Sequence, residues 1–179
     1  MYHFLYNIDV NILLFIQEHL RNHILTPIFK FLTTVGNGGM IWLVIILGML
    51  CYKNTRNVGI AALITLVACI IINNIILKNF VARPRPFEML TQLQALIKKP
   101  TDFSFPSGHT ASSFAVAGAI YFLGNKNWGI GAFILAGAIG FSRLYLGVHY
   151  PSDVICGGMV GIFTSLLVKR LIIYWQEKN

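Results

Sequence analysis

Stretches of apolar residues long enough to cross a lipid bilayer recur along this chain and limit the folds open to it. The clearest lie at about 57–80, 107–123, 128–146 and 152–174. Crossing the hydrocarbon layer takes about 20 residues of helix. Only 11% of the 179 residues are charged, whereas soluble domains average about 25%. We therefore expect residues 1–179 to form one all-α domain, a polytopic membrane helical bundle without a separate soluble domain.

The first quarter of the chain gives a weaker pattern. Residues 40–52 are apolar but short, and residues 36–39 extend them. Residues 23–35 are also mostly apolar, whereas residues 10–22 are amphipathic. Amphipathic helices lie along the membrane surface. We therefore expect an amphipathic N-terminal helix followed by about six transmembrane helices, although hydropathy alone also permits about five.

Basic residues gather at the span ends that this layout places on one side of the membrane. They are Lys53, Arg56, Lys126, Lys169, Arg170 and Lys178. Loops rich in lysine and arginine stay in the cytoplasm, so this side is predicted to be cytoplasmic. Lys98 and Lys99 lie on the other side and oppose this orientation. The expected location is a bacterial plasma membrane.

The formal net charge of +8 has a related explanation. In a soluble protein it would suggest nucleic acid as a partner. Here the positive charges lie between apolar stretches. This position indicates that they set the membrane topology, contact anionic head groups or bind an anionic substrate. No nucleic acid partner is expected, and the sequence does not define an oligomeric state.

The long loop at residues 83–105 contains apolar residues at helical spacing. They are Met89, Leu90, Leu93, Leu96 and Ile97. This spacing predicts a short helix lying on the membrane surface. A loop helix that only covers the bundle is an equally good interpretation.

Three polar clusters follow or begin apolar stretches on the predicted extracytoplasmic side. They are Lys78 with Arg83–Pro86, then Pro106–His109, then Ser142 and Arg143 with His149 and Asp153. Lysines, arginines and histidines kept at one membrane boundary indicate a bound anion. A phosphate group fits best, because the guanidinium group of arginine is positively charged and can donate two parallel hydrogen bonds to its oxygens.

The middle cluster has the features of a helix start that binds an anion. Pro106 suits the first turn of a helix, and the next amide groups point out of the helix end. Gly108 lets an anion approach the backbone, Ser107 adds a hydroxyl donor, and His109 stands beside them. A capped helix start with an interfacial histidine is the alternative.

The last cluster pairs an imidazole with an acid. Pro151 marks a helix start, which places Asp153 in the first turn, four residues after His149. A carboxylate on one ring nitrogen fixes the tautomer and leaves the other nitrogen free to attack. Arg143 reaches the same space from the preceding helix end. The alternative is a helix-capping aspartate with a surface histidine.

In the first cluster, the prolines keep the segment extended and hold its guanidinium groups outward. A basic stop sequence that contacts lipid head groups is the alternative, and it stays open for Arg83. Lys78 and Arg85 fit a shared anion site better. All three clusters lie at helix ends on one membrane face, and a separate structural explanation would have to hold for each of them at once. No cluster has metal-ligand spacing, since Glu88 and Asp102 are isolated.

Together the clusters resemble the three-part signature of the type 2 phosphatidic acid phosphatase superfamily. The matching motifs are Lys78-x6-Arg85-Pro86, Pro106-Ser107-Gly108-His109 and Ser142-Arg143-x5-His149-x3-Asp153. The resemblance implies a membrane phosphatase that works without metal or other cofactor. It also implies the catalytic roles: His149 as the nucleophile that forms a phosphohistidine, Asp153 as its support, and His109 as the proton donor to the leaving oxygen.

The remaining signature residues would hold the phosphoryl oxygens: Lys78, Arg85, Ser107, Gly108 and Arg143. The implied substrate is a lipid phosphate or diphosphate whose tail stays in the bilayer, of the undecaprenyl pyrophosphate, phosphatidylglycerophosphate or phosphatidate class. Two alternatives remain open: a non-hydrolytic lipid-binding or lipid-transport protein, and a phosphotransferase that passes the group from His149 to another acceptor.

Overall fold

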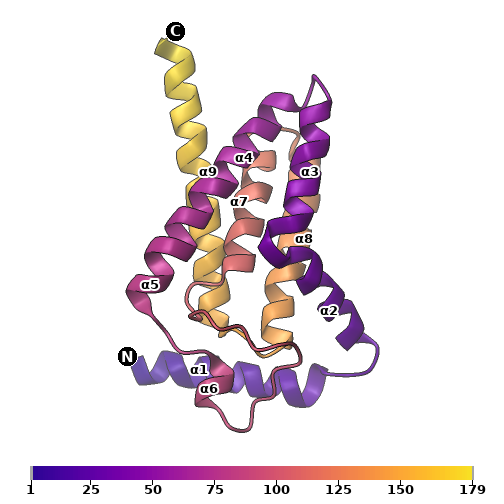
Figure 1. Ribbon diagram of the computed structural model, residues 1–179, viewed down its shortest axis with the longest axis vertical. Helices are drawn as coiled ribbons and strands as arrows, with labels where there is room; N and C mark the ends of the chain where they lie inside the picture. Colours follow the sequence, from indigo (N-terminus) through magenta and orange to yellow (C-terminus); the bar gives the residue numbers. More distant parts are fainter. Residues whose placement is uncertain (1, 179) are drawn as a thin grey trace.

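A computed structural model describes residues 2–178, and within them every regular element is a helix (Figure 1). Long helices stand side by side, and a shorter helix lies across one end of them. In chain order the elements are α1 (Tyr2–Phe15), η1 (Ile16–Leu20), α2 (Leu25–Gly36), η2 (Asn37–Gly39), α3 (Met40–Cys51), α4 (Arg56–Ile70), η3 (Ile71–Leu77), α5 (Lys78–Val81), α6 (Pro86–Met89), α7 (Gly108–Leu123), α8 (Lys126–Tyr145) and α9 (Pro151–Lys178). The all-α membrane bundle expected from the sequence is confirmed.

Helix α7 lies at the centre of the bundle, between α4, α8 and α9 (Figure 1). Its surface is built from small residues, so neighbouring backbones approach closely. A Cβ on Gly161 of α9 would lie 2.4 Å from the carbonyl oxygen of Ala111 and 2.7 Å from the amide nitrogen of Ala115. The glycine therefore sets the distance between α7 and α9.

The outer faces of the long helices carry large apolar side chains. Those exposed on α3, α4, α8 and α9 include Val44, Leu47, Ile60, Ile64, Val67, Ile134, Ile155, Met159 and Phe163. Water does not tolerate such a belt, whereas lipid does. Within residues 2–178, four helical stretches are long and apolar enough to cross a membrane: 25–51, 56–89, 126–145 and 151–178. The chain is an integral membrane protein.

The structure differs from the six-span layout near the N-terminus. Residues 23–35 and 36–52 were expected as two crossings, but α2 and α3 follow each other as the two halves of a single bent stretch, Leu25–Cys51. The bend lies at Gly38 and Gly39, whose φ angles of 58° and 72° belong to the left-handed region that glycine adopts most easily. The stretch therefore counts once, where the six-span layout counted it as two crossings.

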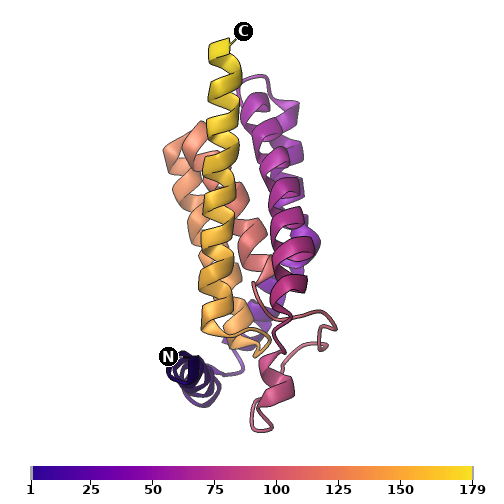
Figure 2. The same cartoon turned by 90° about the vertical axis from the view of Figure 1, so that its left-hand side faces the viewer.

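Helix α1 lies across the end of the bundle where α5, α7 and α9 meet the long loop (Figures 1 and 2). One face exposes Phe4, Leu5, Ile8, Ile12 and Phe15. The opposite face packs through Leu13 onto the long loop and the start of α9. An amphipathic N-terminal helix was expected over residues 10–22; the helical segment begins earlier, at Tyr2, and runs through η1 to Leu20.

The predicted surface helix in the long loop is wrong in its position. The helical turn is α6, Pro86–Met89, and residues 90–107 are irregular. Their apolar side chains are used for tertiary packing: Leu90 and Leu93 pack against α1, and Leu96 and Ile97 pack beside η1. The helical spacing of these apolar residues therefore reflects their contacts with two different neighbours and does not reflect a helix.

Candidate active site

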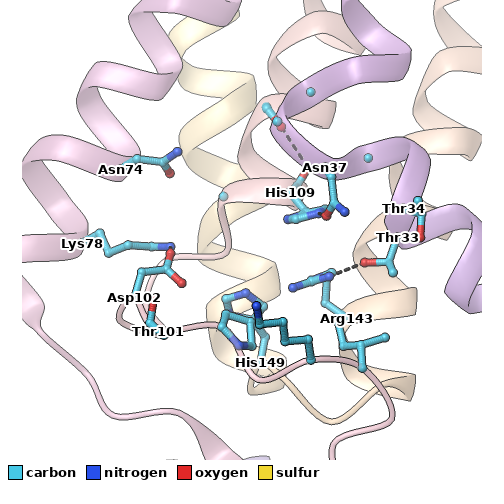
Figure 3. A pocket seen from close by; sticks show the side chains of 18 of the residues that line it. Thr33, Thr34, Asn37, Asn74, Lys78, Thr101, Asp102, His109, Arg143 and His149 are labelled. Atoms are coloured by element: carbon cyan, nitrogen blue, oxygen red, sulfur yellow. Dashed lines mark hydrogen bonds and ion pairs between the residues drawn. The ribbon is translucent and has the colours of Figure 1, made fainter.

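The three clusters meet around one cavity of about 710 Å³. Six of the eight predicted site residues line it: Lys78, Arg85, Gly108, His109, Arg143 and His149. In Figure 3, Lys78 enters from one side and Arg143 from the opposite side, with His109 above and His149 below. The other two, Ser107 and Asp153, are fully buried and do not line it; Asp153 contacts His149, which does.

His149 lies in the short loop between α8 and α9 and is almost completely buried. Its Nδ1 is 3.6 Å from Oδ2 of Asp153, and its Nε2 is 3.3 Å from Nη1 of Arg85. One ring nitrogen thus faces an acid, while the other faces the cavity and a cation. Burial lowers the pKa of His149 to about 3, against the opposing effect of Asp153. The ring is therefore neutral at pH 7, the form in which a nitrogen can act as a nucleophile.

Asp153 is held in place by three hydrogen-bond donors and by the dipole of its own helix. Helix α9 begins at Pro151, as predicted, which places the carboxylate in its first turn. Oδ2 accepts from the backbone amide of Tyr150 at 2.9 Å and from the Ser104 hydroxyl. Oδ1 accepts from Arg83 at 2.7 Å, and the positive end of the α9 dipole is the fourth favourable partner. The carboxylate is therefore oriented before any substrate binds.

Lys78 and Arg85 converge on a carboxylate that the sequence interpretation treated as isolated. Arg85 Nη2 donates to Oδ1 of Asp102 at 2.6 Å, and Lys78 Nζ pairs with Oδ2 of the same residue. Partial burial acts to raise the pKa of Asp102, but the hydrogen bond and charge of Lys78, with those of Arg85, outweigh it and lower the pKa to about 2. Asp102 is therefore ionised and belongs to the cation cluster of the site, although within the described residues it is part of no group of metal ligands.

Arg143 occupies the last turn of α8, where a cation suits the negative end of the helix dipole. It is 3% exposed. Its Nη1 bonds the hydroxyl of Thr33 on α2, and within the described residues its Nε has no hydrogen-bond partner. Figure 3 shows the guanidinium turned into the cavity. A buried donor without a partner is suited to an anionic ligand.

His109 stands in the first turn of α7, opposite the bend between α2 and α3. Its Nε2 lies 2.9 Å from Oδ1 of Asn37. An amide oxygen can only accept, so Nε2 carries the proton in this arrangement. A Cβ on Gly36 would lie 3.1 Å from the His109 ring, so the absence of a side chain at Gly36 makes room for it.

Ser107 and Gly108 contribute differently from each other. The Ser107 amide donates to the carbonyl of Asp153 at 3.0 Å, and its hydroxyl accepts from Thr110 at 2.9 Å. The first of these bonds ties the start of α7 to the start of α9. Gly108 lines the cavity, and a Cβ there would lie 2.8 Å from Oδ1 of Asn74. The glycine is therefore required by packing as well as by access to the cavity.

Five site residues were missed by the sequence analysis: Thr33, Asn37, Asn74, Asp102 and Ser104. A signal existed for Asn74, because paired asparagines at 73 and 74 interrupt an apolar span, and polar residues within spans are usually functional. Glu88, also described as isolated, accepts from the Arg85 amide at 2.9 Å and so caps α6. Among residues 4–178, no three His, Cys, Asp or Glu side chains gather to hold a metal ion.

The chain also resembles known proteins over most of its length. The undecaprenyl-diphosphatase of Sulfolobus acidocaldarius is 33% identical over 162 residues, which are 90% of this chain and 78% of that protein. Among solved structures, Aquifex aeolicus LpxE has a TM-score of 0.74 at 25% identity and covers 91% of this chain and 95% of its own. The transmembrane PAP2 type phosphatidylglycerolphosphate phosphatase of Bacillus subtilis has a TM-score of 0.71 at 26% identity, covering 97% of this chain and 98% of its own.

A family model agrees with these relatives. It is the model of the PAP2 superfamily, and it matches residues 58–177, which include all three clusters. That range is well over half of the chain, and the resemblance found in the sequence motifs is confirmed. The chain belongs to the PAP2 superfamily.

Proposed function

We propose that this protein is a membrane phosphatase that hydrolyses lipid phosphates or diphosphates through a phosphohistidine. The observation that carries the proposal is the environment of His149. A neutral imidazole backed by Asp153 turns its second nitrogen toward a cavity lined by cations and a second imidazole. Phosphoryl transfer needs little more than such positioning and charge stabilisation.

In the proposed reaction, Nε2 of His149 attacks phosphorus and the bond to the leaving oxygen breaks. For this step His109 carries a proton on both ring nitrogens; it gives one of them to that oxygen and becomes neutral. Lys78, Arg85 and Arg143 neutralise the charge that develops on the phosphoryl oxygens. Water then attacks the phosphohistidine, His109 takes the water proton, and phosphate leaves. The Asp153 carboxylate stabilises the positive charge on His149 while the phosphoryl group is attached.

The whole chain acts as one domain in this proposal. The relatives are named for undecaprenyl diphosphate and for phosphatidylglycerolphosphate, so both lipids are candidate substrates. Exposed apolar faces beside the cavity suit a substrate whose tail remains in the bilayer. We further propose that the cavity opens on the extracytoplasmic side, because the basic loops lie at the opposite end of the bundle.

The test is phosphate release by the purified protein in detergent, with a panel that includes both lipids, in the presence and absence of EDTA. We expect release in EDTA and its loss in the His149→Ala variant. His19→Ala is the matched control, because His19 is exposed and lies outside the cavity. Equal release by wild type and His149→Ala contradicts the proposal. Transfer to an added alcohol in place of water indicates a phosphotransferase instead.

A further inference from the structure

Arg83 is the cation for which contact with lipid head groups was left open, and the structure contradicts that interpretation. Its side chain is only 16% exposed and lies between two carboxylates. Nη1 donates to Oδ1 of Asp153 at 2.7 Å, and Nη2 donates to Oδ2 of Asp9 at 2.8 Å. The guanidinium also stacks on the ring of Tyr150, 3.9 Å from its centroid. A group fixed on every side in this way is not available to bind lipids.

Both carboxylates are buried, with side-chain exposures of 0% for Asp153 and 5% for Asp9. Asp9 belongs to α1, the helix that lies across the end of the bundle. It also accepts from the Ser152 amide at 2.9 Å and from the Ser152 hydroxyl. A continuous chain of bonds therefore runs from α1 through Arg83 to the carboxylate that faces His149.

The two carboxylate oxygens of Asp153 have different partners. Oδ2 is the oxygen that faces His149 Nδ1, and Oδ1 is the oxygen bound by Arg83. The backbone of Arg83 is fixed as well, because its carbonyl accepts from the Ser104 amide at 2.8 Å. The bond to Oδ1 therefore fixes the direction in which Oδ2 points.

The net charge of Asp9, Arg83 and Asp153 also affects how well Asp153 can support His149. Arg83 alone would neutralise Asp153 and weaken its ability to stabilise a positive imidazole. Asp9 on the far side of the guanidinium leaves the three side chains with one net negative charge. Ion pairs out of water interact much more strongly than exposed ones, so this balance affects His149 directly.

Building on the proposed function, we infer that Arg83 is a positioning residue for the His149–Asp153 pair and that Asp9 of α1 sets its charge balance. The helix that lies across the end of the bundle thereby becomes part of the catalytic apparatus. Arg83 touches neither the cavity nor the reacting atoms, so its effect is expected in kcat and not in binding of the substrate.

The decisive experiment is a charge-restoring pair of substitutions. Asp9→Asn leaves Asp153 neutralised by Arg83, and Arg83→Gln leaves two buried carboxylates without the cation between them. Each single change is expected to lower kcat at least about tenfold, the size of one buried charged hydrogen bond. KM and inhibition by orthovanadate are expected to stay near the wild-type values. The double variant restores one net negative charge and is expected to recover activity above either single variant.

Arg21→Gln is the matched control. Arg21 also ties the N-terminal helical segment to the loops at this end of the bundle, through bonds to the carbonyls of Tyr145 and Gln94, and it makes no bond to Asp153. We expect it to keep kcat. Two results would overturn the inference in favour of simple anchoring. One is a loss of kcat in Arg21→Gln equal to that in Arg83→Gln. The other is a loss of kcat in the double variant equal to the product of the two single losses.

A spectroscopic measurement separates this inference from the proposed function. In protein labelled with 15N-histidine, the His149 signals are assigned with the His149→Asn variant. Arg83→Gln and Asp9→Asn are expected to shift those signals, and Arg21→Gln is not. Unchanged His149 signals in both variants overturn the inference even if the enzyme is active. Shifted signals in a protein that releases no phosphate refute the proposed function and leave the positioning role standing.

Discussion

At the scale of single residues, Asp102 brings a negative charge to two cations that are proposed to bind phosphate. Its carboxylate bonds Arg85 through one oxygen and Lys78 through the other. Two oxygens on two cations is also the pattern that a phosphoryl group would make. An anionic ligand must therefore compete with Asp102 for the same donors or share them with it.

This competition predicts the behaviour of Asp102→Asn. The side chain of Asp102 is 54% exposed, so solvent weakens its ion pairs and the effect is expected to be modest. Orthovanadate should inhibit the variant at a concentration about two- to fivefold lower. Inhibition curves on purified protein check this. Weaker inhibition in the variant would mean that Asp102 serves to hold Arg85 in position.

His149 predicts a pH dependence of stability. Burial lowers its pKa to about 3 in the folded protein, whereas an unfolded histidine has a pKa of about 6.5. Below that value the unfolded chain binds a proton that the folded chain refuses. The stability linked to His149 is therefore complete above pH 6.5 and is lost progressively as the pH falls toward 3.

The corresponding measurement is thermal unfolding in detergent between pH 7 and pH 4. The wild-type Tm is expected to fall with pH, and the His149→Asn variant is expected to show a smaller fall. Equal slopes for the two proteins would show that the folded state does protonate His149, through a larger influence of Asp153.

At the scale of helices, the contact between α7 and α9 holds the site together. His109 lies at the start of α7 and Asp153 at the start of α9, and the Ser107 amide bonds the Asp153 carbonyl between them. Further along the same contact, Gly161 allows the two backbones to touch. A change in this spacing reaches both of the proposed catalytic groups through rigid helices.

Gly161→Ala is therefore expected to lower both stability and activity. The new methyl group meets backbone atoms that have no rotamer to change, and overpacking of this kind costs about 1–3 kcal/mol. Gly137→Ala is the control, because Gly137 is exposed on α8 with no atom within 4 Å of its added Cβ. Thermal unfolding and phosphate release measure the two effects. Equal values for the two variants would argue against close packing as the determinant.

At the scale of the whole molecule, the distribution of charge predicts an orientation. The loop before α4 and the end of α9 are basic and lie at the end of the molecule opposite α1 and α6 (Figure 1). In protein with its three cysteines replaced by alanine, Lys98→Cys should react with a membrane-impermeant maleimide in intact bacterial cells. Lys53→Cys should react only after the membrane is opened. Both positions are exposed, and the reverse pattern of labelling would invert the topology.

Much of this architecture could be predicted from local sequence alone. Apolar length specifies membrane helices, because a bilayer leaves few other ways to satisfy the backbone. Pro151 marked the start of α9, and the motif spacing selected the side chains that line the cavity. The N-terminal spans were less predictable, because a bend at Gly38 and Gly39 and a second crossing give similar hydropathy.

The tertiary structure decided which side chains contact one another in the site. Asp102, Asn37 and Thr33 reach the site from segments whose local patterns carry no sign of it, and Arg83 looked like a surface cation until Asp9 and Asp153 were placed around it. The sequence determined which groups sit at helix ends, since helix length and polarity are local properties. Only the packing of helices around α7 decided which of those groups meet, since contacts between distant segments depend on how the backbones fit together.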